Sequence, residues 1–184
     1  MKCPLCHPRR LFSNSPSGLT LIELIVTLVI LGILLTIAIP LMRPLLRSTS
    51  LTSSANSFVA ALNYARSEAV TRGGRVVACA SANPMADPPA CSNNANWQTG
   101  WLVFVDSNDN NTYQAANDVL LRVSGPLGGD LTLAGAAAAV AFTNMGGATA
   151  GNGNYVVCST GLRRWTVNIT PSGRINNDRG AVCP

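Results

Sequence analysis

A chain of 184 residues, of which 47% are apolar and only 11% charged, is long enough for one domain and hardly for two. Its formal net charge of +5 falls to +2, ten basic against eight acidic groups, without residues 1–18, so the global charge says little about partners. The single histidine, His7, lies in that early stretch, so the remainder lacks an obvious general base at neutral pH and enzymatic chemistry is disfavoured.

The first predicted element is a membrane-spanning helix over Leu19–Ile39, a stretch of 21 residues in which Glu23 is the only ionisable group. At about 1.5 Å per residue it would span roughly 30 Å, the thickness of the hydrocarbon core of a bilayer. No A-x-A cleavage pattern follows the apolar run, which argues against removal of the whole block as a secretory signal. The basic residues before it should stay cytoplasmic, so the chain leaves the membrane outward; they are Lys2, Arg9 and Arg10.

After Pro40 the apolar residues become periodic, which predicts an amphipathic helix packed on a core. They recur at steps of 4, 3, 4, 3 and 4, at Leu51, Ala55, Phe58, Leu62, Ala65 and Ala69. Glu68 and Arg72 stand in the favourable order for a pair within a helix, and Gly73–Gly74 supplies a left-handed stop. We therefore expect one helix from Leu19 to about Arg72, bent where Pro40 removes a backbone donor.

From Arg75 onward, short β-like runs alternate with loops, which predicts an antiparallel sheet domain and, with the helix, an α+β fold. The expected strands are Arg75–Ala80, Gly100–Asp106, Val119–Val123, Ala139–Thr143, Tyr155–Ser159, Trp165–Thr170 and a short piece near Arg174. The loops between them are rich in Asn, Gly and Pro and comprise Asn83–Asn96, Ser107–Asn111, Gly125–Gly129 and Gly146–Asn154. In Trp165–Thr170 apolar and polar residues alternate, so one face should be buried. The Ala-rich run Ala134–Ala141 is compatible with helix or strand.

The six cysteines divide into two before the apolar segment and four after it. Four on the outward side fit an oxidising periplasm and two disulfides. Of the three pairings that four cysteines allow, we favour Cys79–Cys91 and Cys158–Cys183, because each closes a local loop. Cys3-Pro-Leu-Cys6-His7 contains half of a zinc site, but no fourth ligand lies on the cytoplasmic side, so no metal is expected.

The boundary Gly18-Leu19-Thr20-Leu21-Ile22-Glu23-Leu24 resembles the prepilin leader site of type IV pilins and type II secretion pseudopilins. In that family the chain is cut after the glycine, the new amino terminus is methylated, and a glutamate stands at the fifth mature position. The resemblance implies cleavage after Gly18 and methylation of Leu19 by a prepilin peptidase and N-methyltransferase. Leucine in place of the usual phenylalanine is a departure. Pro40 falls where many pilins carry a helix-bending proline.

Glu23 would be the assembly glutamate of that family. A carboxylate at the centre of a bilayer costs about 2.5–3.5 kcal/mol, and less near the interface, so such a residue needs a partner. The resemblance implies that this partner is the freed amine of Leu19, in the same chain or in a neighbouring subunit, where it sets the register of assembly. The alternative is a carboxylate that extends to the lipid headgroups.

Most of the remaining chain is similar to the GspH/FimT family of minor pilins. The matching motifs, in chain order, are Asn63-Tyr64-Ala65-Arg66-Ser67-Glu68-Ala69, Trp97-x-x-Gly100-Trp101-x-Val103-Phe104-x-Asp106, Phe142-x-x-x-Gly146 and Ser172-Gly173-Arg174. The resemblance implies a β-rich exported domain packed on the second half of a long helix. The chain then divides into a leader (1–18), a transmembrane helix (19–39), its amphipathic continuation (40–74) and a periplasmic domain (75–184).

Four late arginines are a candidate DNA-binding site: Arg163, Arg164, Arg174 and Arg179. Some FimT-like pilins bind DNA through a Gly-Arg-x-Arg motif. Here Gly173-Arg174 matches, whereas Asn176 replaces the second arginine, and Arg179 would have to substitute from the same loop. We favour the alternative, a solvated basic loop without a ligand.

The run from Asp106 to Asn111 resembles the oxygen-rich start of a calcium loop. However, Asn111 stands where an EF-hand needs glycine, and Asn117 where it needs a bidentate glutamate. An Asn/Asp hairpin turn explains the run with fewer assumptions, so calcium is not expected.

The sequence therefore predicts a non-catalytic minor pilin, without cofactors, that acts in type IV pilus assembly or initiation. We expect it in the inner membrane with its carboxyl-terminal domain in the periplasm, and in the filament after processing. Its partners would be the prepilin peptidase and other minor and major pilins. The equivalent pseudopilin of a type II secretion system shares every feature and stays open. A DNA-binding subunit for natural transformation and an unrelated single-span periplasmic enzyme are further alternatives.

Overall fold

The computed structural model describes residues 18–184, apart from the side chains at positions 40 and 41. Helix α1 extends over Leu21–Arg72 and begins two residues later than the expected Leu19. It ends at the expected glycine pair, where Gly73 has a φ of 65°. The N–H groups of Gly73 and Gly74 donate to the carbonyls of Val70 and Ala69, which satisfies the last turn of the helix as in a Schellman cap.

The chain forms two compact units, Met1–Arg43 and Pro44–Pro184, and the described strands all belong to the second. The bend expected at Pro40 lies beside the boundary between these units and stays a prediction. The division of the chain into leader, membrane helix, amphipathic continuation and exported domain likewise stays a prediction.

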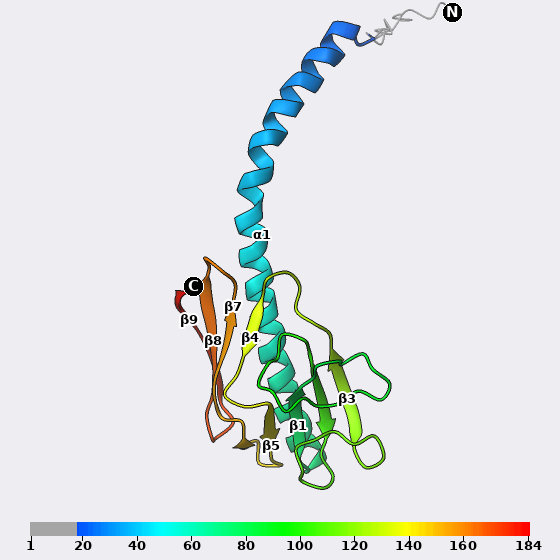
Figure 1. Cartoon of the computed structure of the whole chain (residues 1–184), viewed down its shortest axis with the longest axis vertical. Helices are drawn as coiled ribbons and strands as arrows, with labels where there is room; N and C mark the ends of the chain where they lie inside the picture. Colours follow the sequence, from blue (N-terminus) through cyan, green and yellow to red (C-terminus); the bar gives the residue numbers. More distant parts are fainter. Residues whose placement is uncertain (1–17) are drawn as a thin grey trace, which may run out of the picture. The chain divides into compact units, whose positions relative to one another are not determined.

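Two antiparallel sheets lie beside the second half of α1 (Figure 1). The five-stranded sheet has the order β3-β2-β1-β5-β6, with the respective bounds Val119–Ser124, Trp101–Val105, Val76–Ala80, Ala139–Phe142 and Ala148–Ala150. The four-stranded sheet has the order β4-β7-β8-β9, with the bounds Thr132–Ala134, Gly153–Cys158, Arg163–Ile169 and Ile175–Val182. Every strand pairing in the described part of the chain is antiparallel, which confirms the expected α+β class.

The second half of α1 and both sheets enclose a hydrophobic core. Phe58 lies in it, with its ring centroid 5.2 Å from that of Trp97, 5.5 Å from that of Trp101 and 5.4 Å from that of Tyr155. These rings join the helix to β2 of one sheet and β7 of the other, in the edge-on and tilted geometries that aromatic rings prefer. The periodic stripe is buried at all of its expected positions: Leu51, Ala55, Phe58, Leu62, Ala65 and Ala69.

The five-stranded sheet is buried on its other face as well. Val77 and Phe104 belong to a smaller core there, against which Cys91 and Tyr113 pack from the loops. Because β1 is covered on both faces, all five of its residues are buried. Its sequence VVACA is accordingly a continuous apolar run and does not alternate.

Some sequence expectations need correction. The prediction of a loop over Gly146–Asn154 is wrong, since this segment contains β6 and the start of β7. Strands β4 and β6, of three residues each, are too short to show a periodic pattern. Strand β9 has eight residues, longer than the short piece expected near Arg174; its polar sequence reflects an exposed sheet edge. The run Ala134–Ala141 comprises the end of β4, a connection and the start of β5.

Candidate functional site

A helix cap that the sequence analysis missed forms the start of α1. Thr20 precedes the first helical residue, and its Oγ1 accepts a hydrogen bond from the N–H of Glu23 at 3.3 Å. Thr-x-x-Glu is the pattern of a capping box, which satisfies free N–H groups at the start of a helix. Gly18 and Leu19 lie before the helix and are exposed, Leu19 by 75%, so the peptide bond between them is accessible.

Glu23 lies in the first turn of α1, and its side chain is exposed. Among residues 18–184, no cation lies within ion-pair distance of its carboxylate. A negative charge is favourable in this turn, because the free N–H groups of a helix start carry a partial positive charge. The carboxylate is thus partly stabilised by its own helix and accessible to an external amine.

The first half of α1 presents apolar side chains on all sides. Leu21–Ile39 has a mean hydropathy of 2.8, and none of this segment is buried within the structure. By length and composition it is able to cross a membrane. Its leucine, isoleucine and valine residues are about half exposed or more, and apolar surface of this extent needs lipid or another protein to cover it.

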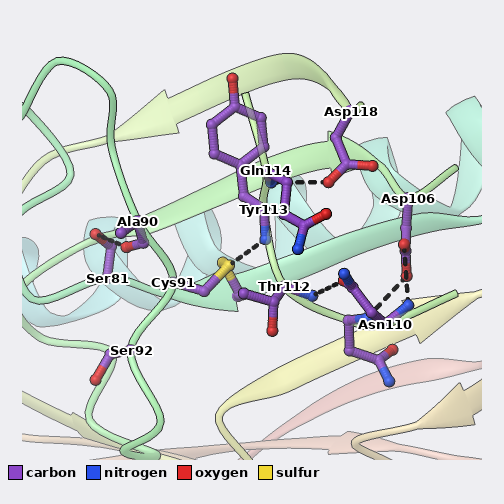
Figure 2. The surroundings of a disulfide bond; sticks show 12 residues. Ser81, Ala90, Cys91, Ser92, Asp106, Asn110, Thr112, Tyr113, Gln114 and Asp118 are labelled. Atoms are coloured by element: carbon purple, nitrogen blue, oxygen red, sulfur yellow. Dashed lines mark hydrogen bonds between the residues drawn. A yellow bond between two sulfur atoms is a disulfide. The ribbon is translucent and has the colours of Figure 1, made fainter. Parts of the chain in front are cut away.

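Two disulfides hold the β-rich unit, Cys79–Cys91 and Cys158–Cys183, the same pairings that the sequence favours. Cys79 lies in β1, and Cys91 draws the following loop over the outer face of the sheet. There its Sγ accepts a hydrogen bond from the N–H of Tyr113 at 3.2 Å (Figure 2). The other disulfide ties the carboxyl terminus to the end of β7.

Two buried carboxylates organise the acidic loop after β2. Asp106, 3% exposed, accepts two backbone N–H groups of this loop at 3.2 and 2.9 Å. Asp118, 7% exposed, accepts two more, from Ser107 at 3.0 Å and from Gln114 at 2.8 Å, and Figure 2 shows the second of these. The Nε of Arg75 lies 3.2 Å from Asp106 Oδ2 and supplies the local positive charge. The carboxylates therefore face the backbone and an arginine, which favours the hairpin interpretation over a calcium loop.

The structure separates the four late arginines. Arg163 on β8 and Arg179 on β9 line the same cavity of about 180 Å³ beside α1. Arg164 follows Arg163 along β8 and lies on the other face of the strand. Arg174 lies at the opposite end of the β8–β9 hairpin, where its Nε donates to Asn176 Oδ1 at 3.1 Å. Asn176, which stands where the motif has its second arginine, thus accepts a hydrogen bond from Arg174, the first arginine of the motif. The four arginine side chains do not form one basic patch.

Motifs that are distant in the sequence meet at Arg66. Its Nε donates to the carbonyl of Gly146 at 2.8 Å, and its Nη2 lies 3.5 Å from the carbonyl of Ser172. Gly173, with a φ of 75°, packs against Gly146 so closely that a Cβ would lie 1.9 Å from the Gly146 oxygen. Only glycine fits there. Arg66 therefore joins α1 to the β5–β6 and β8–β9 turns, a contact across 80 and 106 residues that no local sequence signal reveals.

Comparisons with known proteins agree with this architecture. The family model of the type II transport protein GspH matches residues 54–173. The model of the prokaryotic N-terminal methylation motif matches residues 13–39, of which 13–17 lie outside the described residues. No curated protein sequence matches significantly.

Two crystal structures of the type IV minor pilin FimU from Pseudomonas aeruginosa are similar to this chain. The one in space group P21 has a TM-score of 0.53 and 21% sequence identity, and the match covers 72% of this chain and 90% of that chain. The one in space group P65 has a TM-score of 0.49 and 22% identity, with 69% and 91% covered. At such identity, the P21 likeness supports the fold.

Proposed function

Because this chain belongs to the family of the type II transport protein GspH, we propose that it is a non-catalytic minor pilin of a type IV pilus, made with a cleavable leader. The observation that carries the proposal is the methylation motif over residues 13–39, which spans the Gly18–Leu19 boundary. The exposed bond at that boundary suits cleavage by a prepilin peptidase, and the apolar helix after it suits an inner-membrane anchor.

The proposed cycle begins with insertion of Leu21–Ile39 into the membrane and with the β-rich unit in the periplasm. Cleavage after Gly18 and methylation of Leu19 follow, and the subunit is then extracted laterally into a filament. The apolar side chains of α1 stay covered throughout, first by lipid and then by equivalent helices of neighbouring subunits. Transfer between these environments therefore needs no exposure of apolar surface to water.

Glu23 is the residue proposed to set the register of assembly. Cleavage creates a positively charged amine on Leu19, one turn before Glu23, and a neighbouring subunit presents the same pair of charges. Pairing of a carboxylate with an amine in an apolar environment removes the cost of leaving either charge isolated. The exposure of Glu23 and its lack of a cation among residues 18–184 support this role.

Mass spectrometry of the chain purified from membranes tests the processing step. The expected amino terminus is methylated Leu19, and a strain without its prepilin peptidase should retain residues 1–18. An intact Met1 in the wild-type strain would contradict the proposal and indicate a plain membrane anchor.

The second candidate is the equivalent pseudopilin of a type II secretion system, which the name of the matching family favours. Both machines use a subunit with this helix and this processing site, so phenotype must separate them. Deletion of the gene should abolish twitching motility if the chain serves a pilus. Normal twitching with loss of exoprotein secretion would instead identify the secretion pseudopilin.

DNA uptake through the four late arginines is not proposed. Arg174 is engaged by Asn176, and Arg163 lies at the far end of the same hairpin. Phosphate contacts contribute through their number, so dispersed arginines make a weak site for a DNA backbone.

A further inference from the structure

A polar groove lies over α1, between two strands that Figure 1 shows on opposite sides of the helix. One wall carries Arg122 of β3 and the other Arg179 of β9. The groove encloses about 670 Å³ and is continuous, through Ser53, Ser57 and Arg122, with a second cavity of about 310 Å³. Its floor is a hydroxyl-rich face of the helix, formed by Ser48, Thr49, Thr52, Ser53, Asn56 and Ser57.

Among the described residues, this groove is lined by arginines and by no carboxylate. Arg163 adds a third guanidinium, in the cavity that it shares with Arg179. Within residues 18–184, none of Arg122, Arg163 and Arg179 forms an ion pair. The lining thus offers hydrogen-bond donors and positive charge to an acceptor-rich, negatively charged ligand.

The guanidinium of Arg179 is held in place before any ligand arrives. It lies over the ring of Trp165, 4.9 Å from the centroid, in a cation–π arrangement. The Nε1 of Trp165 in turn donates to Thr52 Oγ1 on α1 at 3.4 Å. Binding to this arginine therefore needs little ordering of its side chain.

Trp101 of β2 lines the other end of the groove and carries a buried donor. Trp101 is 2% exposed, and within the described chain its indole N–H has no hydrogen-bond partner. The same residue lines the smaller cavity together with Arg122 and Ser57. Buried donors are nearly always paired, so this unpaired N–H is a candidate donor for a ligand that enters the smaller cavity.

We propose that this groove binds an extended acidic segment of a partner protein, with carboxylates on Arg122 and Arg179 and an acceptor oxygen at Trp101. β3 and β9 are edge strands, so their outer backbone groups have no partner strand. An extended peptide is able to form backbone hydrogen bonds with such edge strands, whereas a compact anion cannot follow a strand in this way. The inference goes beyond the proposed pilin function, because it depends on the groove and not on processing of the amino terminus.

Fluorescence anisotropy of a labelled octaglutamate peptide, titrated with the full chain in detergent micelles, tests the proposal. Saturable binding is expected, and Arg122→Glu or Arg179→Glu should each weaken it roughly tenfold, because each replaces an attraction with a repulsion. Trp101→Phe keeps the ring and removes the donor, so it should weaken binding by a few-fold. Circular dichroism of each variant must show wild-type thermal unfolding for its result to count.

Arg164→Glu is the matched control, since it makes the same charge change on the other face of the β8–β9 hairpin, where Arg164 lies against Gly180. It should change the affinity less than twofold. An equal loss for Arg164→Glu, or no binding of octaglutamate to the wild-type chain, would overturn the proposal. Binding of labelled octathymidylate but not of octaglutamate, with loss in the two groove variants, would overturn it in favour of a phosphodiester ligand.

Discussion

The two halves of α1 are both apolar, yet they bury their side chains in different ways. In Leu21–Ile39 the apolar residues cover the whole circumference and stay exposed, whereas in Leu51–Ala69 they form one stripe that the sheets cover. The width of the apolar surface distinguishes the two cases. A stripe is satisfied by the chain's own β-rich unit, while an all-round apolar surface requires lipid or other chains.

Replacement of Glu23 should have the largest effect, because it removes the one charge from the half that depends on other chains. Glu23→Ala should reduce incorporation into sheared filaments at least tenfold while leaving the amount in the membrane unchanged. Immunoblots of filament and membrane fractions measure both quantities. Glu68→Ala, which removes a partly exposed carboxylate from the second half of the same helix, is the control and should leave incorporation normal. Normal incorporation of Glu23→Ala would refute the proposed role.

Truncation in the stripe should affect stability and not assembly chemistry. Phe58→Ala removes a fully buried ring that contacts three other aromatic residues, so it should cost about 3–5 kcal/mol in the free energy of unfolding. Denaturant unfolding followed by tryptophan fluorescence checks the value. Leu28→Ala, in the exposed apolar half, should leave this transition within about 0.5 kcal/mol. Similar losses in the free energy of unfolding from Phe58→Ala and Leu28→Ala would contradict the contrast between the two halves of α1.

Loss of the Arg66 junction should have an intermediate effect. Arg66→Ala leaves the carbonyls of Gly146 and Ser172 without their charged donor, so we expect a loss of about 1.5–3 kcal/mol in the free energy of unfolding. Hydrogen exchange should also become faster in the β5–β6 and β8–β9 turns. If exchange increased only at the end of α1, the arginine would serve the helix and not the turns.

Alkaline pH should produce the smallest effect, through a tyrosine that packs on the stripe. Burial raises the pKa of Tyr155 above its ordinary value, and its hydroxyl donates to the Gly151 carbonyl at 2.7 Å. The folded state thus favours the neutral phenol, and this contribution is complete below the unfolded pKa of about 10 and is lost as the pH rises beyond it. Thermal unfolding at pH 8–11 should therefore show a decline that is smaller in Tyr155→Phe. Equal declines in thermal stability of the wild-type protein and Tyr155→Phe would contradict this role of Tyr155.

The fold could be predicted well where the pattern is local. The stripe of α1 and the alternation in β8 report burial directly, because period and solvent exposure are linked in regular elements. Strands β4 and β6 and the full length of β9 could not be predicted, since they are short or lie at an edge where no core requires apolar residues. The arrangement of the late arginines could not be predicted either, because strand register decides which of these side chains lie close together.

What the sequence by itself determined is the apolar helix, the N-terminal methylation motif that leads into it and the α+β order of elements. All three depend on composition and on neighbours a few residues apart. The tertiary structure alone decided that Asp106 serves its own loop, that Arg66 joins two distant turns, and that Arg122 and Arg179 share a groove. These relations depend on contacts between side chains far apart in sequence, and only the packing of both sheets on α1 brings them together.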